Sequence, residues 1–212
     1  MKKLSTLLII VLSVFFAFGQ NLDPSSYDGI SKDAKKRIFL DNFDSNKYSW
    51  IRKTSPPTHK IQDGFLYFSN EYDFPYVDGK AISYNGNKNW EIETKIKFIS
   101  GDVEAFNGLM WGQLIFGEKY VFSFSSMGYH QIEFIDGYNQ SFIVKPENTG
   151  VINKTSENDI VVRKYEGKYY FFINKVLIYS TNFNDLPGQY IGFSVAPNSM
   201  MRIYYLKLWY ID

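Results

Sequence analysis

From Ile38 onward the chain alternates apolar and polar residues with a period of two, and turn residues interrupt these runs. Successive side chains of a strand point to opposite faces, so this period predicts strands that bury one face. No stretch keeps the period of an amphipathic helix. We expect strands in the runs 37–43, 59–69, 80–85, 90–100, 108–116, 119–126, 129–136, 140–145, 158–183, 189–197 and 201–211.

Short turns join these runs, for example Asp136-Gly137 and Glu166-Gly167. Such links are typical of antiparallel neighbours. Aromatic residues make up 19% of the chain, and they suit the pleated surface of a sheet. The pattern therefore predicts an all-β fold, an antiparallel sandwich or barrel.

The N-terminal segment 1–19 has the pattern of a secretory signal peptide. Two lysines precede an apolar run over 7–18, and small residues precede a plausible cut before Gln20. The polar segment 20–37 then predicts a tether, followed by one domain over 38–212. We expect a secreted protein, periplasmic or extracellular, with no membrane span after signal cleavage.

Composition excludes several kinds of site and partner. The chain has no cysteine, which rules out disulfides, thiolate zinc sites and a cysteine nucleophile, and export without cysteine suits a bacterial envelope or extracellular space. The net charge of +1 provides no basic field for nucleic acid. His59 and His130 are the two histidines, and neither lies in a motif with metal-ligand spacing.

Three blocks carry a resemblance to a known superfamily. "NDIVVRKYEGKYYFFINKVLIYSTNF" (158–183), followed by "LPGQYIGFSVAP" and "MRIYYLKLW", is similar to the closing strands of concanavalin A-like lectins and glucanases and of laminin-G-like domains. "FNGLMWGQLIFGEKYVFSFSSMGYHQIEFIDG" (106–137) and "LDNFDSNKYSW" (40–50) resemble the bacterial branch of 3-keto-disaccharide hydrolases and family 16-like domains. The resemblance implies an antiparallel two-sheet jelly-roll sandwich. It leaves the activity open, because the superfamily hosts hydrolases, lectins and protein-binding modules.

Glu91 and Glu93 are weak candidates for a catalytic pair. They share one face of the strand 90–100, and same-face neighbours lie about 6.5–7 Å apart, within the range of roughly 5–9.5 Å for glycosidase carboxylates. The laminarinase-type signature of the superfamily resembles E-[ILV]-D-[hydrophobic]-x-E, and its acid position is filled by Lys95, or by Ile96 if the bulged form is assumed. The Glu-Glu-Lys-Lys pattern favours a solvated outer face, so we assign no catalytic residue.

Aromatic residues in apparent loops are candidates for ligand binding, because sugar rings stack on exposed aromatic faces. We expect Trp111 and Gln113 to share one strand face and to line a concave surface. The candidates are Tyr72, Tyr76, Trp111, Gln113 and Tyr138.

Asp41 and Asp44 are weak candidates for a calcium site, because they supply oxygen ligands within the short segment 41–44. No EF-hand spacing is present, so calcium stays an alternative to having no cofactor.

The leading hypothesis is a secreted, non-catalytic module that binds a carbohydrate or another cell-surface ligand. The first alternative is a glycoside hydrolase of the 3-keto-disaccharide or family 16-like type. The second is a protein-interaction or adhesion module. The jelly-roll resemblance combined with the broken catalytic signature favours the first of the three.

Overall fold

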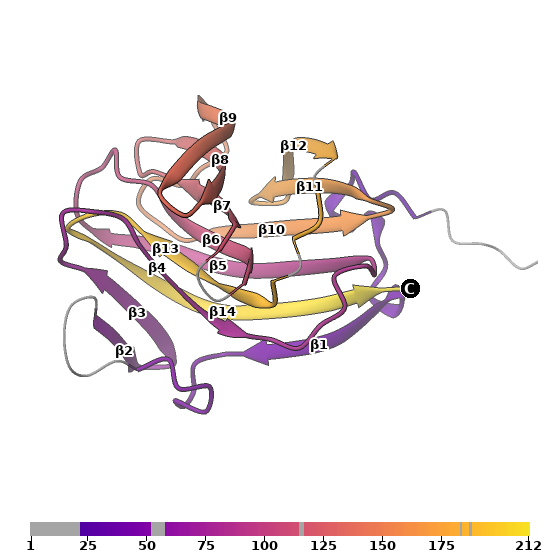
Figure 1. The fold of residues 1–212 in the computed structure, drawn as a ribbon, viewed down its shortest axis with the longest axis horizontal. Coiled ribbons are helices and arrows are strands. Elements are labelled where there is room, and N and C mark those ends of the chain that lie inside the picture. The colour runs from indigo at the N-terminus through magenta and orange to yellow at the C-terminus, as the bar shows by residue number, and fades with distance from the viewer. Residues whose placement is uncertain (1–21, 52–57, 115–116, 183, 187) are drawn as a thin grey trace, which may run out of the picture.

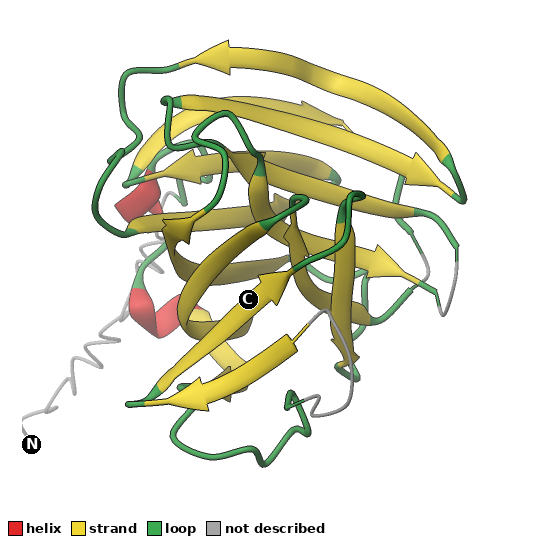
Figure 2. Cartoon of the chain, turned by 90° about the vertical axis from the view of Figure 1, so that its left-hand side faces the viewer, coloured by secondary structure: helices red, strands yellow, loops and turns green. Residues whose placement is uncertain are grey.

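A computed structural model describes residues 22–51, 58–114, 117–182, 184–186 and 188–212. Two antiparallel sheets make up the molecule, and two short 3-10 helices, η1 (Tyr27–Gly29) and η2 (Lys32–Ala34), precede them (Figures 1 and 2). The all-β prediction is therefore confirmed. The predicted signal peptide, 1–19, lies outside the described residues. None of the helices in the described part is long and apolar enough to cross a membrane.

Sheet A is the larger sheet, with the order β12-β11-β10-β5-β14-β3-β2, and β1 also pairs with β14. Figure 1 shows β5 and β14 side by side along the molecule. The strands of sheet A are β1 (Lys35–Asp41), β2 (Thr58–Gln62), β3 (Phe65–Asn70), β5 (Trp90–Ser100), β10 (Asn158–Tyr165), β11 (Lys168–Ile173), β12 (Val176–Asn182) and β14 (Ser199–Ile211).

Sheet B has six strands in the order β4-β13-β6-β7-β8-β9. The run expected at 80–85 begins four residues earlier as β4, and β1 begins at Lys35, inside the segment expected to be a tether. The strands of sheet B are β4 (Tyr76–Ala81), β6 (Asn107–Gln113), β7 (Lys119–Phe124), β8 (Tyr129–Asp136), β9 (Asn139–Asn148) and β13 (Tyr190–Val195).

The hydrophobic core lies between the two sheets, where alternate residues of each strand meet. On β5 the inner residues Trp90, Ile92 and Ile96 are buried, as the period of two predicts. Trp111 of sheet B contacts Phe171 of sheet A, with 6.0 Å between ring centroids. Burial of these large side chains supplies most of the drive to fold, at about 25 cal/mol per Å² of apolar surface.

Candidate ligand-binding groove

Glu91 is buried in an ion-pair network on the outer face of sheet A. Its carboxylate lies 2.6 Å from Nζ of Lys35 and 2.6 Å from Nε of Arg163, and the residue is 2% exposed. The expectation of a solvated outer face is therefore wrong for Glu91. Segment 22–34 is the reason, because its backbone packs over this part of the sheet. The Arg163 guanidinium donates hydrogen bonds to the carbonyl oxygens of Pro24, Ser26 and Tyr27.

Glu93 is also engaged with its neighbours. It accepts a hydrogen bond from the hydroxyl of Tyr205 at 2.8 Å and pairs with Nζ of Lys207 at 3.1 Å. Neither Glu91 nor Glu93 lines the groove described next, which lies on sheet B. The structure therefore gives both residues structural partners on the sheet that faces away from that groove.

A groove of about 1070 Å³ lies on the outer face of sheet B. The register of the sheet places Val77, Ser194, Gly108, Ser123 and Gln131 opposite one another on β4, β13, β6, β7 and β8. Their sequence neighbours on these strands face the core, so this row faces outward. The three central residues of the row are small, which leaves the floor of the groove hollow.

Four connections between strands complete the lining of the groove, and the β13–β14 connection contributes Ala196, Pro197 and Asn198. Phe74 and Pro75 come from the β3–β4 loop, Phe106 from the β5–β6 loop, and Tyr138 from the β8–β9 turn. Tyr138 is fully exposed and Phe74 is 57% exposed. The groove thus combines polar side chains on its floor with exposed aromatic rings at its edges, which is typical of sites for amphipathic ligands.

Ser123 is a buried polar residue on the floor of the groove. The residue is 1% exposed, and its hydroxyl has no hydrogen-bond partner among the described residues. A buried polar group without a hydrogen-bond partner lowers the stability of the folded state by about 1–3 kcal/mol. A ligand hydroxyl in the groove would satisfy this group.

Glu133 is the carboxylate of the groove floor and stands two residues along β8 from Gln131. It is 5% exposed, and the side-chain amides of Gln140 and Gln131 donate hydrogen bonds to it. Burial raises the pKa of this carboxyl, and the two amide donors oppose the rise only in part. Within the described part of the chain, no lysine, arginine or histidine nitrogen lies within 4.0 Å of it.

The groove continues into a smaller cavity of about 280 Å³ that shares Glu104 and Phe106 with it. Ser125 lines this cavity, and its buried hydroxyl also lacks a partner among the described residues. Ser123 and Ser125 lie two apart in sequence, on the outer side of β7 and just beyond its end. Buried hydroxyls without a hydrogen-bond partner among the described residues therefore occur in both the groove and the smaller cavity.

The tyrosines predicted from the sequence have different positions. Tyr138 lines the groove, as described above. Tyr72 stacks on Phe74, with ring centroids 4.9 Å apart and planes at 8°, so it supports a residue of the lining. Tyr76 belongs to β4 rather than to a loop and packs against Phe68 of the core. The ligand-binding roles of all three stay predictions.

The expectation that Trp111 and Gln113 share one face is wrong. Trp111 pairs with Ile191 and Gln113 with Tyr190, so one residue is skipped between them. That residue is Gly112, whose φ of 78° lies in the left-handed region that glycine favours. The bulge reverses the alternation, so that Trp111 lies in the core, 1% exposed, and Gln113 lies on the outer side.

Hydrogen bonds within the chain already engage Asp41, one of the two candidate calcium ligands. Oδ1 of Asp41 accepts a hydrogen bond from the backbone N–H of Phe43, and Oδ2 accepts one from Nε1 of Trp50, both at 2.8 Å. Asp44 is exposed. The described ranges hold no group of three or more His, Cys, Asp or Glu residues that could bind a metal ion. Asp41 instead closes the turn that buries Trp50.

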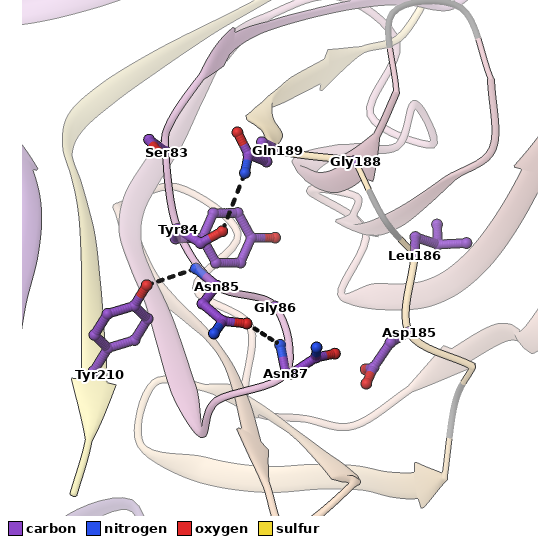
Figure 3. Close-up of a pocket in the computed structure, with 10 residues that line it drawn as sticks. All are labelled: Ser83, Tyr84, Asn85, Gly86, Asn87, Asp185, Leu186, Gly188, Gln189 and Tyr210. Carbon is purple, nitrogen blue, oxygen red and sulfur yellow. Dashed lines mark hydrogen bonds between the residues drawn. The ribbon is translucent and has the colours of Figure 1, made fainter.

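A second pocket, of about 620 Å³, lies between the β4–β5 loop and the segment before β13 (Figure 3). Its polar groups bind one another. Asn85 donates its N–H to the hydroxyl of Tyr210, and Gln189 donates to the carbonyl of Tyr84. Asp185 accepts hydrogen bonds from Lys164 and from Tyr169. Because these groups form hydrogen bonds within the chain, they are not left without partners among the described residues, as Ser123 of the groove is.

Sequence reasoning missed Ser123, Gln131 and Glu133. A signal was present, because "VFSFSS" and "HQIEF" place polar side chains at alternate positions of two apolar strands. This alternation predicts that one face of both strands is polar. It does not predict that five distant strands meet there and form a groove.

No family model matches the sequence, and no curated protein matches it. Solved structures do match the fold. A protein of unknown function with a galectin-like fold from Bacillus subtilis has a TM-score of 0.61 at 11% identity, over 83% of this chain and 97% of that one. The Bacillus licheniformis β-glucanase has a TM-score of 0.58 at 9% identity, over 82% and 97%.

A third match is the CBM2 module of the evolved Dit of Lactobacillus casei BL23 phage J-1. Its TM-score is 0.54 at 9% identity, over 84% of this chain and 96% of that one. At such identities the likeness concerns the fold alone, and carbohydrate-binding modules and glucanases share it. The chain therefore has the fold of a concanavalin A-like jelly-roll sandwich, as its sequence predicts.

Proposed function

We propose that the protein is a non-catalytic glycan-binding module whose ligand lies in the groove on sheet B. The observation that carries the proposal is the hollow floor of that groove and its polar side chains, above all the hydroxyl of Ser123, which has no partner among the described residues. Sugars present hydroxyl groups at their edges and apolar C–H groups on their faces. The floor suits the hydroxyls, and the exposed rings of Tyr138 and Phe74 suit the faces.

The two glutamates that correspond to the catalytic signature, Glu91 and Glu93, lie outside the groove, which supports binding without catalysis. A glycosidase of the usual kind needs two carboxyl groups that flank the scissile bond. Of the strand residues that line the groove, Glu133 is the one carboxylate. Asp102 and Glu104 also line it but belong to the β5–β6 loop, where Asp102 accepts a hydrogen bond from the N–H of Glu104.

The fold and the N-terminal sequence add support. A CBM2 module and a β-glucanase share this fold, so it accommodates glycan ligands in other proteins. Secretion, which segment 1–19 predicts, would expose the groove to glycans outside the cell.

A glycoside hydrolase is the second candidate, and one observation favours it. Burial raises the pKa of Glu133, which is the direction that a general acid requires. Release of reducing sugar from a panel of polysaccharides, abolished by Glu133→Gln, would establish this activity and overturn the non-catalytic proposal.

A glycan array with the 20–212 protein tests the proposal. We expect binding that weakens about tenfold or more in Gln131→Ala, because a buried amide that contacts ligand hydroxyls is removed. Gln113→Ala is the matched control, since Gln113 lies on the outer side of sheet B but does not line the groove. A blank array would overturn the proposal, and so would equal losses in the two variants.

A further inference from the structure

We infer that the groove selects glycans that carry a protonated amino group, and that the carboxylate of Glu133 binds this group. The inference rests on the proposed function, because it names the class of glycan for the same groove.

Glu133 is a buried carboxylate that faces a cavity and accepts hydrogen bonds from two neutral amides. In the sheet it stands opposite Val121 of β7 and Phe142 of β9, so neither direct cross-strand neighbour is charged. Gln131 and Gln140 hold the carboxylate in place without neutralising it. Buried carboxylates are rarely left without a positive partner, because desolvation of the charge is costly. An ammonium group in the groove would supply the missing charge.

The rest of the lining adds to the negative field. Asp102 and Glu104 line the groove together with Glu133, whereas Lys119 is the one cation among the described lining residues. Lys119 is, like Ser123, a diagonal neighbour of Glu133 in the register, but no ion pair within 4.0 Å joins these two described residues. Lys119 interacts with Asp136, the next acidic residue along the chain from Glu133. Three carboxylates against one ammonium favour a cationic ligand and disfavour uronic acids or sulfated sugars, since potentials of binding partners are complementary.

The hydroxyl of Ser123, which has no partner among the described residues and also supports the proposed function, lies near Glu133. Ser123 stands opposite Gln131 in the register and is therefore a diagonal neighbour of Glu133. Diagonal neighbours across two strands lie about 7–8 Å apart, so one sugar ring can contact both side chains. The hydroxyl can bind a ring hydroxyl while the carboxylate binds an amino group on the same residue.

Four tetrasaccharides and a peptide test the inference by calorimetry with the 20–212 protein. The probes are a β-1,4-glucosamine tetramer, its fully N-acetylated form, cellotetraose, a galacturonate tetramer and tetralysine. We expect the glucosamine tetramer to bind about tenfold more tightly than the N-acetylated and neutral tetramers, as one charge-assisted hydrogen bond predicts. The galacturonate tetramer and tetralysine should not bind, because the first is repelled and the second lacks a sugar ring.

Glu133→Gln should reduce the tenfold preference to about twofold or less while the neutral tetramers still bind. Gln113→Ala, outside the groove, should keep the preference. The comparison among ligands uses the wild-type protein, so it stands even if Glu133→Gln does not fold. Equal affinities for the glucosamine tetramer and cellotetraose would overturn the inference and leave the proposed function standing. Binding of no glycan at all would overturn both, and tight binding of tetralysine would overturn the inference, because charge alone would then be recognised.

Discussion

Replacement of Glu91 by glutamine tests whether this residue stabilises the fold. The substitution keeps the shape of the side chain and removes its charge. Arg163, which is 1% exposed, would then keep its hydrogen bonds to three carbonyl oxygens of segment 22–34 but lose its anionic partner. Breaking a buried pair from one side costs about 3–5 kcal/mol.

We expect a loss near 3 kcal/mol, at the low end of this range, because the amide oxygen of glutamine can still accept one hydrogen bond. Folded domains are stable by about 5–15 kcal/mol, so the loss is a large share of the total. Urea unfolding followed by tryptophan fluorescence would measure it. With a slope of about 1–3 kcal/mol per M, the midpoint should fall by about 1–3 M.

Lys95→Gln is the matched control on the same strand. The pair of Lys95 with Asp159 is 3.5 Å long, and its side chains are 30% and 27% exposed. Exposed pairs contribute about 0–1 kcal/mol, so this variant should unfold close to the wild-type midpoint. The reasoning would be refuted if Glu91→Gln were no less stable than Lys95→Gln, because the buried ion pair would then contribute nothing.

Three further predictions concern other parts of the molecule. Burial lowers the pKa of His130 below 6.5, so the unfolded state takes up a proton first as the pH falls. Stability should therefore decline below about pH 6.5. Urea midpoints at pH 7.5 and 5.5 would show the decline, and His130→Gln should reduce it; an unchanged decline would assign it to another group. Tyr138→Ala should change stability by less than about 0.5 kcal/mol because the side chain is fully exposed, yet weaken glycan binding on the array; unchanged binding would remove Tyr138 from the site. Addition of EDTA should leave the melting temperature unchanged, because both oxygens of Asp41 already accept hydrogen bonds; a lower melting temperature would instead reveal a bound cation.

The strands were predictable because their evidence is local. Strands 90–100 and 129–136 have the bounds that their alternation predicts. The apolar side chain at each inner position is visible in the sequence itself. The bulge at Gly112 was not predictable, because a single glycine in a strand is compatible with regular pairing too. Because of this bulge, Trp111 faces the core while Gln113 faces the outer side of the sheet.

The sites were less predictable because they depend on contacts between distant segments. Glu91 and Lys95 look alike as outward charges in the sequence, yet only Glu91 is covered, by Arg163 from 72 residues away and by segment 22–34. The groove likewise depends on the register of five strands whose floor residues range from Val77 to Ser194. A local pattern can show that Glu133 and Ser123 face outward but not that they face a cavity.

The most direct test of the account is to find which sheet the glycan contacts. Hydrogen exchange measured by mass spectrometry, with and without the tightest ligand from the array, reports this residue segment by residue segment. The account predicts slower exchange in the β5–β6 loop, β7 and β8 when the glycan is bound, and no change in β5 or β14. Protection confined to β5 and β14, around Glu91 and Glu93, would contradict it.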